Sequence, residues 1–235
     1  GLVRDSAGEE VTALSAWAGL GRRYPLAGAV FSLFLLAFAG ALSSGKRYLF
    51  RTAASFVQII GGIQSKPYLT KDDLYPAGSS RKPGLIIVGS YVERTTKQLE
   101  ALKELPGIHW VEWRVSEAKE EGSLQAEVER VIKEAEKGFQ MGRDVCIYTS
   151  RDYLRIDHQA GKSEKNLLYS VRVSEGLVRV VQGLKSKPGF LIAKGGITSS
   201  DIGVKGLRVK EAFVLGQIRP GITVWKLGTE SRFPG

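Results

Sequence analysis

The chain has 235 residues, of which 43% are hydrophobic and 25% charged, a composition typical of a folded globular protein and not of a disordered one. A total of 34 Lys and Arg residues against 24 Asp and Glu gives a formal net charge of +10, which favours an anionic partner: a nucleotide, a phosphorylated metabolite, a nucleic acid or a membrane surface. The single cysteine, Cys146, excludes an intrachain disulfide and a cysteine-based metal cluster. His109 and His158 are too few and too far apart to indicate a metal site. We therefore expect a reducing compartment and a cytoplasmic location.

A charge-free segment, "LAGAVFSLFLLAFAGAL", covers residues 26–42 and predicts an apolar helix. Such a helix would be about 25 Å long, just short of the roughly 30 Å hydrocarbon core of a bilayer. Three interpretations stay open: a buried or dimer-packing helix, which the sequence favours, a membrane span, or a disturbed segment. The basic residues at both of its ends leave a membrane orientation undetermined.

The next two segments predict the end of one domain and a linker. Residues 45–63, "GKRYLFRTAASFVQIIGGI", are consistent with a strand that leads into a short helix. Residues 64–83 combine proline, glycine and serine with other polar residues, which is linker composition. We therefore expect a first domain, only partly present, over residues 1–63, a linker over 64–83 and a second domain over 84–235.

The second domain shows a regular alternation of strand and helix patterns. Apolar or alternating runs predict strands over residues 84–90, 107–115 and 144–150, and a buried strand in "FLIA", residues 190–193. Amphipathic patterns predict helices over residues 91–105, 124–142 and 165–184. The last segment, residues 206–228, predicts two strands around a turn at Pro220-Gly221. The expected fold class is α/β: a mainly parallel sheet flanked by helices in three layers, preceded by a partial helical or α/β segment.

Small polar residues follow three of the predicted strands, as Gly89-Ser90, Thr149-Ser150 and the run "GGITSS" from Gly195 to Ser200. Ligands of open α/β sheets bind beyond the carboxyl ends of the strands, where glycine lets a phosphate approach the backbone and hydroxyl groups donate hydrogen bonds. The alternative is that these residues only form turns and helix caps. No Walker loop and no complete GxGxxG fingerprint is present in the sequence. Gly216, at the end of "AFVLG", is consistent with the border of the same site or with a simple turn.

The motifs "VGS", "YTS", "KGGITSSDI" and "GQIRPGITVWKLG", in this order, resemble the carboxyl-terminal nucleotide-binding domain of the four-carbon acid sugar kinases. These are ATP-dependent kinases that act on threonate, erythronate and 3-oxo-tetronate type substrates. The segment "GKRYLFRTAASFV" resembles the end of the substrate domain of the same family, so the resemblance covers roughly residues 45–235. The ending "ESRFPG" is similar to plant-type homologues, some of which are fused to dehydrogenase-like and aldolase-like regions.

The resemblance implies ATP and Mg²⁺ as cofactors and a four-carbon sugar acid as substrate. The implied ATP contacts are Ser90, Gly195, Gly196, Ile197, Thr198 and Ser199, with Gly216 as a weaker candidate. The implied sugar-acid contacts are Arg51, Thr52 and Ser55. The DDxTG-type motif that carries the catalytic aspartate of the family is absent from the sequence, so no catalytic residue and no metal ligand is assigned. A GNxG-type stretch of the family would follow "ESRFPG".

The expected function is therefore the ATP-binding portion of a kinase that phosphorylates the terminal hydroxyl of a four-carbon sugar acid, inactive by itself. A homodimer is compatible with this expectation. The competing interpretation is a membrane-associated or nucleic-acid-associated α/β binding module without catalysis. Its basic residues are scattered along the sequence and not arranged in a stripe, so we expect no nucleic-acid partner. A Rossmann enzyme of unrelated chemistry would need an acidic residue near Glu112 for a ribose, but the first glycine loop lacks the second and third glycines.

Overall fold

The computed structural model describes Arg22, Gly62, Gln64 and residues 25–47, 66–75, 81–90, 92–151 and 163–234. The chain divides into two compact units, Gly1–Lys66 and Pro67–Gly235, which are considered separately. Most of the strand and helix expected over residues 45–63 lies outside the described residues, and so do the expected sugar-acid contacts Arg51, Thr52 and Ser55.

In the first unit, the apolar segment forms helix α2, Pro25–Ser43, as the sequence predicts. Its large apolar side chains are exposed around the helix; Leu26, Leu33, Phe34 and Leu36 are among the most exposed. None of the helices in the described part of the chain combines the length and the hydropathy needed to cross a membrane.

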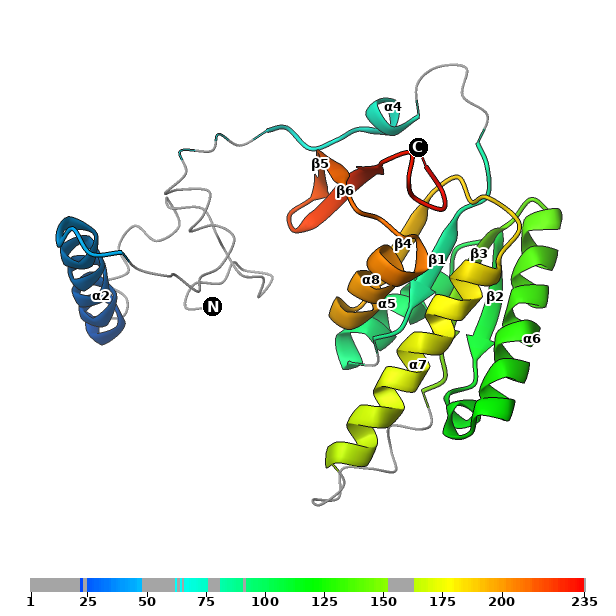
Figure 1. Ribbon diagram of the computed structural model, residues 1–235. Coiled ribbons are helices and arrows are strands. Elements are labelled where there is room, and N and C mark those ends of the chain that lie inside the picture. The colour runs from blue at the N-terminus through cyan, green and yellow to red at the C-terminus, as the bar shows by residue number, and fades with distance from the viewer. Residues whose placement is uncertain are drawn as a thin grey trace. The chain divides into compact units, whose positions relative to one another are not determined.

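The second unit is built on a four-stranded parallel sheet with the order β2-β3-β1-β4 (Figure 1). The strands are β1 Leu85–Val88, β2 Ile108–Trp113, β3 Asp144–Thr149 and β4 Leu191–Lys194. The helices that connect them are α5 Glu93–Lys103, α6 Glu121–Gln140 and α7 Ser163–Gly183. The predicted alternation of strands and helices, and with it the α/β fold class, is confirmed.

Alternate residues of the strands face opposite layers of helices. Leu85 and Ile87 of β1 belong to the main core, which β3, α6 and α7 complete. Ile86 and Val88 of the same strand belong to a second cluster, with Leu99 of α5. Helices α6 and α7 therefore cover one face of the sheet and α5 the other, which gives the three predicted layers (Figure 1).

Strand β4 differs from the prediction, because it is not buried. Among the described strands it pairs with β1 alone, and half of the Ile192 side chain is exposed. A run of four apolar residues does not reveal whether a strand lies in the middle or at the edge of a sheet.

The residues after β4 also differ from the loop that the glycines and hydroxyls indicated. They form a short helix, α8 Gly196–Asp201, which continues into a π-helical turn, Ile202–Gly206. A 3₁₀ turn over Val115–Lys119, after β2, was not predicted either.

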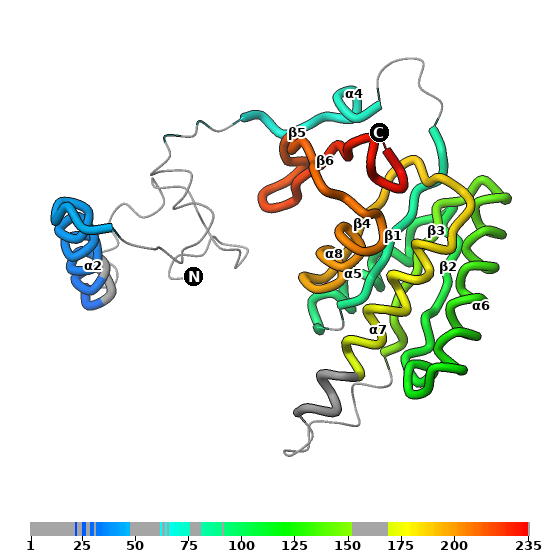
Figure 2. The backbone as a smooth tube through the Cα atoms, in the orientation of Figure 1, coloured from blue at the N-terminus to red at the C-terminus, as the bar shows by residue number. Residues whose placement is uncertain are grey.

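The last two strands form a separate antiparallel hairpin, β5 Ala212–Arg219 and β6 Ile222–Leu227. The predicted turn at Pro220-Gly221 is present, with Gly221 at a φ of +76°. Part of the predicted linker lies against this hairpin, because the Leu69 N–H donates to the Gln217 carbonyl at 2.8 Å. The short helix α4, Lys71–Leu74, follows in the chain and begins with a capping box at Thr70. Figure 2 shows the path of the chain from β4 through α8 to the hairpin.

A buried carboxylate joins α6 to the end of β2. Glu127 accepts hydrogen bonds from the main-chain N–H and the guanidinium of Arg114, and from the guanidinium of Arg130. Burial alone would raise the pKa of Glu127, but the hydrogen bonds from both arginines outweigh it and lower the pKa to about 2.

The first prediction concerns the packing of α7 on the sheet. A Cβ at Gly176 would lie less than 3.0 Å from two ring atoms of Trp113, whose side chain is fully buried and cannot move aside. We expect Gly176→Ala to lower the free energy of unfolding by about 1 to 3 kcal/mol through overpacking, in spite of the better helix propensity of alanine. Gly122→Ala in α6 is the matched control, since nothing lies within 4 Å of its Cβ position. Equal denaturation midpoints for the two variants would contradict this packing.

The second prediction concerns acid stability. The folded-state pKa of Glu127 is lowered from 4.5 to about 2, so its contribution is complete above about pH 4.5 and is lost as the pH falls towards 2. Glu127→Gln should therefore destabilise the protein by roughly 2 to 3 kcal/mol at neutral pH, a range that allows for the partial exposure of both arginines. Urea denaturation of both proteins at several pH values measures this difference. A difference that stays constant between pH 7 and pH 2.5 would refute the coupling.

Candidate functional site

The carboxyl edge of the parallel sheet has the topology of a ligand site. The chain leaves β1 for α5 on one face, whereas it leaves both neighbours of β1, namely β3 and β4, for helices on the other face. Ligands of open α/β sheets bind where neighbouring connections diverge in this way. The relevant residues are therefore those that directly follow β1, β3 and β4.

The segments after β1 and β4 interlock at this edge. The N–H groups of Gly89 and Ser90 both donate to the carbonyl of Lys194, at 3.2 and 3.3 Å. A Cβ at Gly89 would lie less than 3.0 Å from the Thr198 hydroxyl, and a Cβ at Gly195 would lie 3.2 Å from the Cβ of Ser90. Gly195 also has a φ of +128°, which other residues rarely adopt. The structure thus brings the predicted residues of these two segments together, and both glycines are needed for the approach.

Most of the predicted hydroxyl groups are engaged within the protein. The Ser90 hydroxyl lies 3.1 Å from that of Thr95, the buried Thr198 packs against Gly89, and the Ser199 hydroxyl donates to the Gly196 carbonyl at 3.1 Å. Gly196 and Ile197, in contrast, face open space: nothing lies within 4 Å of a Cβ at Gly196, and the Ile197 side chain is 70% exposed. The first N–H groups of a helix have no acceptor within it, so the amides at the start of α8 are the groups that a ligand could use.

The segment after β3 adds a residue that sequence reasoning missed. The Ser150 hydroxyl accepts from the Val115 N–H at 3.1 Å, so it serves the protein's own structure. Arg151 follows directly, and its Nη1 donates to the carbonyl of Ser90 at 2.6 Å. A basic residue immediately after "YTS" was the only signal in the sequence.

Gly216 is not part of this edge of the sheet. It lies in the middle of β5, in the separate hairpin, where a Cβ would meet the side chain of Leu69 at 3.1 Å. Lys194, at the end of β4, is exposed.

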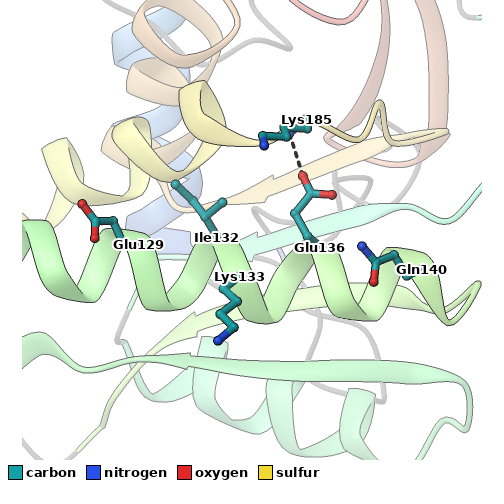
Figure 3. A pocket seen from close by; sticks show the side chains of 6 residues that line it. All are labelled: Glu129, Ile132, Lys133, Glu136, Gln140 and Lys185. Carbon is teal, nitrogen blue, oxygen red and sulfur yellow. Dashed lines mark hydrogen bonds between the residues drawn. The ribbon is translucent and has the colours of Figure 1, made fainter.

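A pocket of the second unit lies at the opposite end of the sheet. It is lined by residues of α6 and by Lys185, which follows α7; the lining residues are Glu129, Ile132, Lys133, Glu136, Gln140 and Lys185 (Figure 3). Glu136 links α6 to the segment after α7, because its carboxylate accepts from the main-chain N–H of Lys185 (Figure 3). It also accepts from the main-chain N–H of Ser186. The predicted site residues take no part in this pocket, which lies at the amino ends of β3 and β4.

Neither cysteine chemistry nor a metal cluster is indicated in the described part of the chain. Cys146 is fully buried in β3, and this burial raises the pKa of its thiol to about 12. Among the described residues, His, Cys, Asp and Glu side chains do not form a group of three or more that could hold a metal ion.

Residues 85–234, more than half of the chain, match the family of the nucleotide-binding C-terminal domain. The chain belongs to the four-carbon acid sugar kinase family. The match begins at β1 and ends after the hairpin, so it includes the whole carboxyl edge of the sheet. The fold and the family that the sequence motifs indicated are both confirmed.

Short segments of this sugar kinase homologue are similar to proteins of another kind. The NADH-quinone oxidoreductase subunit N of Rhodococcus opacus is 73% identical over 45 residues, which are 19% of this chain and 8% of the relative. The subunit N 3 of Streptomyces griseus is 61% identical over 57 residues, 23% of this chain and 10% of the relative. The subunit N of Mycobacterium tuberculosis is 56% identical over 76 residues, 28% of this chain and 14% of the relative. The chain thus spans at most about a seventh of these relatives.

The third prediction tests the interlocked segments of the kinase family domain. Gly89→Ala should lower the free energy of unfolding by about 1 to 3 kcal/mol, because its Cβ has no room beside Thr198. Thr198→Ala in the same chain removes the obstructing hydroxyl and should restore part of this loss, a favourable coupling in a double-mutant cycle. Gly196→Ala serves as the control, because its added Cβ would lie in open space. Additive effects of the two substitutions would show that the segments do not touch.

Proposed function

We propose that the carboxyl edge of the sheet binds ATP, and that the chain is the nucleotide-binding portion of a sugar-acid kinase. The observation that carries this proposal is the interlocking of Gly89 and Ser90 with Lys194 and Thr198 at the point where the strand connections diverge. The family match, which covers residues 85–234 and is described as a nucleotide-binding domain, supports it.

Main-chain groups are the chemical basis of the proposed site. The N–H groups of Gly196 and Ile197 lie at the start of α8 and would donate to phosphate oxygens, which the small size of the glycines would let approach. Thr198, Ser199 and Ser90 shape the site, because their hydroxyls bond or pack within the protein. Mg²⁺ would be bound mainly by the phosphates of ATP and by water, as is usual for this ion in kinases.

The substrate of the complete reaction is proposed to be a four-carbon sugar acid of the threonate, erythronate or 3-oxo-tetronate type, phosphorylated at its terminal hydroxyl. Phosphoryl transfer depends on positioning and on the neutralisation of charge, and it needs a group that orients the acceptor hydroxyl. The sequence contains no DDxTG-type motif that would supply the catalytic aspartate of the family. We therefore propose that these 235 residues bind nucleotide without appreciable turnover, in the cytoplasm.

The fourth prediction is nucleotide binding by the full chain. Isothermal titration calorimetry with Mg-ATP and Mg-ADP should show saturable binding, and a coupled kinase assay with threonate or erythronate should show little or no turnover. Lys133→Ala, in the pocket at the opposite end of the sheet, should leave the affinity unchanged.

Three results would count against the proposal. If neither nucleotide gives heat at millimolar concentration, the chain does not bind nucleotide. A loss of affinity in Lys133→Ala would move the site to the α6 pocket. A steep salt dependence of RNA binding by the same chain would favour the nucleic-acid module instead.

A further inference from the structure

The side chain of Arg151 makes a different contact from those of Arg114, Arg130 and Arg81. Arg114 and Arg130 share the carboxylate of Glu127, and Arg81 pairs with Asp144. Arg151 has no ion pair among the described residues, and its described contact is the hydrogen bond from Nη1 to the Ser90 carbonyl. A guanidinium carries five N–H donors, so most of its capacity is left over.

Two of the remaining donor atoms of Arg151 are shielded from solvent. Its Nε and Nη2 atoms are buried, and within the described structure neither has a hydrogen-bond partner. Desolvation lowers the pKa of Arg151, and the opposing interactions with Tyr148 and Cys146 do not outweigh it. Buried cationic donors without an acceptor are costly, so these two groups need a partner, and an anion is one that suits their charge.

The place of Arg151 defines the kind of anion. Its side chain enters from β3 and reaches the loop after β1, while the loop after β4 packs on the same two residues, Gly89 and Ser90. The guanidinium is therefore beside the proposed nucleotide site and not in a separate part of the surface. A planar fork of donors suits a phosphate, which can accept two parallel N–H bonds.

We propose that Arg151 binds the phosphate chain of the nucleotide, with the Ser90 carbonyl holding one arm of its guanidinium in place. The inference rests on the proposed function, and it makes Arg151 a binding residue that distinguishes nucleoside polyphosphates from nucleosides. A purely structural Arg151 would link the loops after β1 and β3 but would not affect this discrimination.

The fifth prediction compares two arginines at opposite ends of β3. Arg151→Gln should weaken the binding of ATP and of ADP by about 10- to 100-fold and leave adenosine binding unchanged, because only the phosphates contact the side chain. Arg143→Gln removes the same charge before the strand, where Arg143 is exposed, and should leave every affinity unchanged. Isothermal titration with ATP, ADP, adenosine and pyrophosphate measures these differences.

The outcomes separate this inference from the function on which it rests. If the wild type binds ATP and Arg151→Gln equals Arg143→Gln, the role of Arg151 is wrong and nucleotide binding stands. Equal losses for adenosine and ATP show a structural role and also overturn the inference. If the wild type binds pyrophosphate but not ATP, the kinase proposal is wrong. The affinities of Arg151→Gln and Arg143→Gln for pyrophosphate then test the role of Arg151. If the wild type binds neither ATP nor pyrophosphate, both the proposed function and the role of Arg151 are refuted. Should Arg151→Gln fail to fold, Arg151→Lys, which keeps the charge but loses the fork, should give an intermediate affinity for ATP.

Discussion

The close approach of the loop after β1 to the first turn after β4 is the constraint on which the site depends. Gly89 leaves no room for a side chain beside Thr198, and the Lys194 carbonyl accepts from two consecutive N–H groups of the facing loop. These contacts fix the start of α8 next to Ser90, which in turn holds Arg151 through its carbonyl. Three segments from three adjacent strands are thereby joined at one edge of the sheet. Main-chain geometry, more than side-chain chemistry, defines this edge.

The sequence contains enough information for the frame of the nucleotide domain, because its strands and helices have clear periodicities and glycine-rich ends. The sequence says less about which strands and helices lie next to one another in the fold. The apolar run of β4 looks buried, but the strand lies at the edge of the sheet, and a run of glycines and hydroxyls begins a helix instead of a loop. Arg151 could not be selected from the sequence, since its significance comes from contact with Ser90 and from buried donors that only the folded chain reveals. Gly216, a weaker candidate proposed from its place at the end of an apolar run and from the family resemblance, lies in the separate hairpin.

The net charge of +10 is a poor guide to the site, since several of the basic residues serve the fold. Arg114 and Arg130 neutralise a buried glutamate, and other arginines pair with carboxylates at the surface. Burial without a counter-charge is the more informative property, because it marks where an anion would be stabilised. The two compact units also have different characters: exposed apolar side chains cover α2 in the first, whereas the second has a packed core and contains the match to the kinase family.

Hydrogen exchange of the full chain, followed by mass spectrometry with and without Mg-ATP, tests the central claim most directly. We expect slower exchange in the peptides that contain Gly89-Ser90 and residues 195–199, and unchanged exchange in the part of α6 that lines the opposite pocket. Protection confined to that part of α6, or no protection anywhere at saturating nucleotide, would contradict a nucleotide site at the carboxyl edge of the sheet.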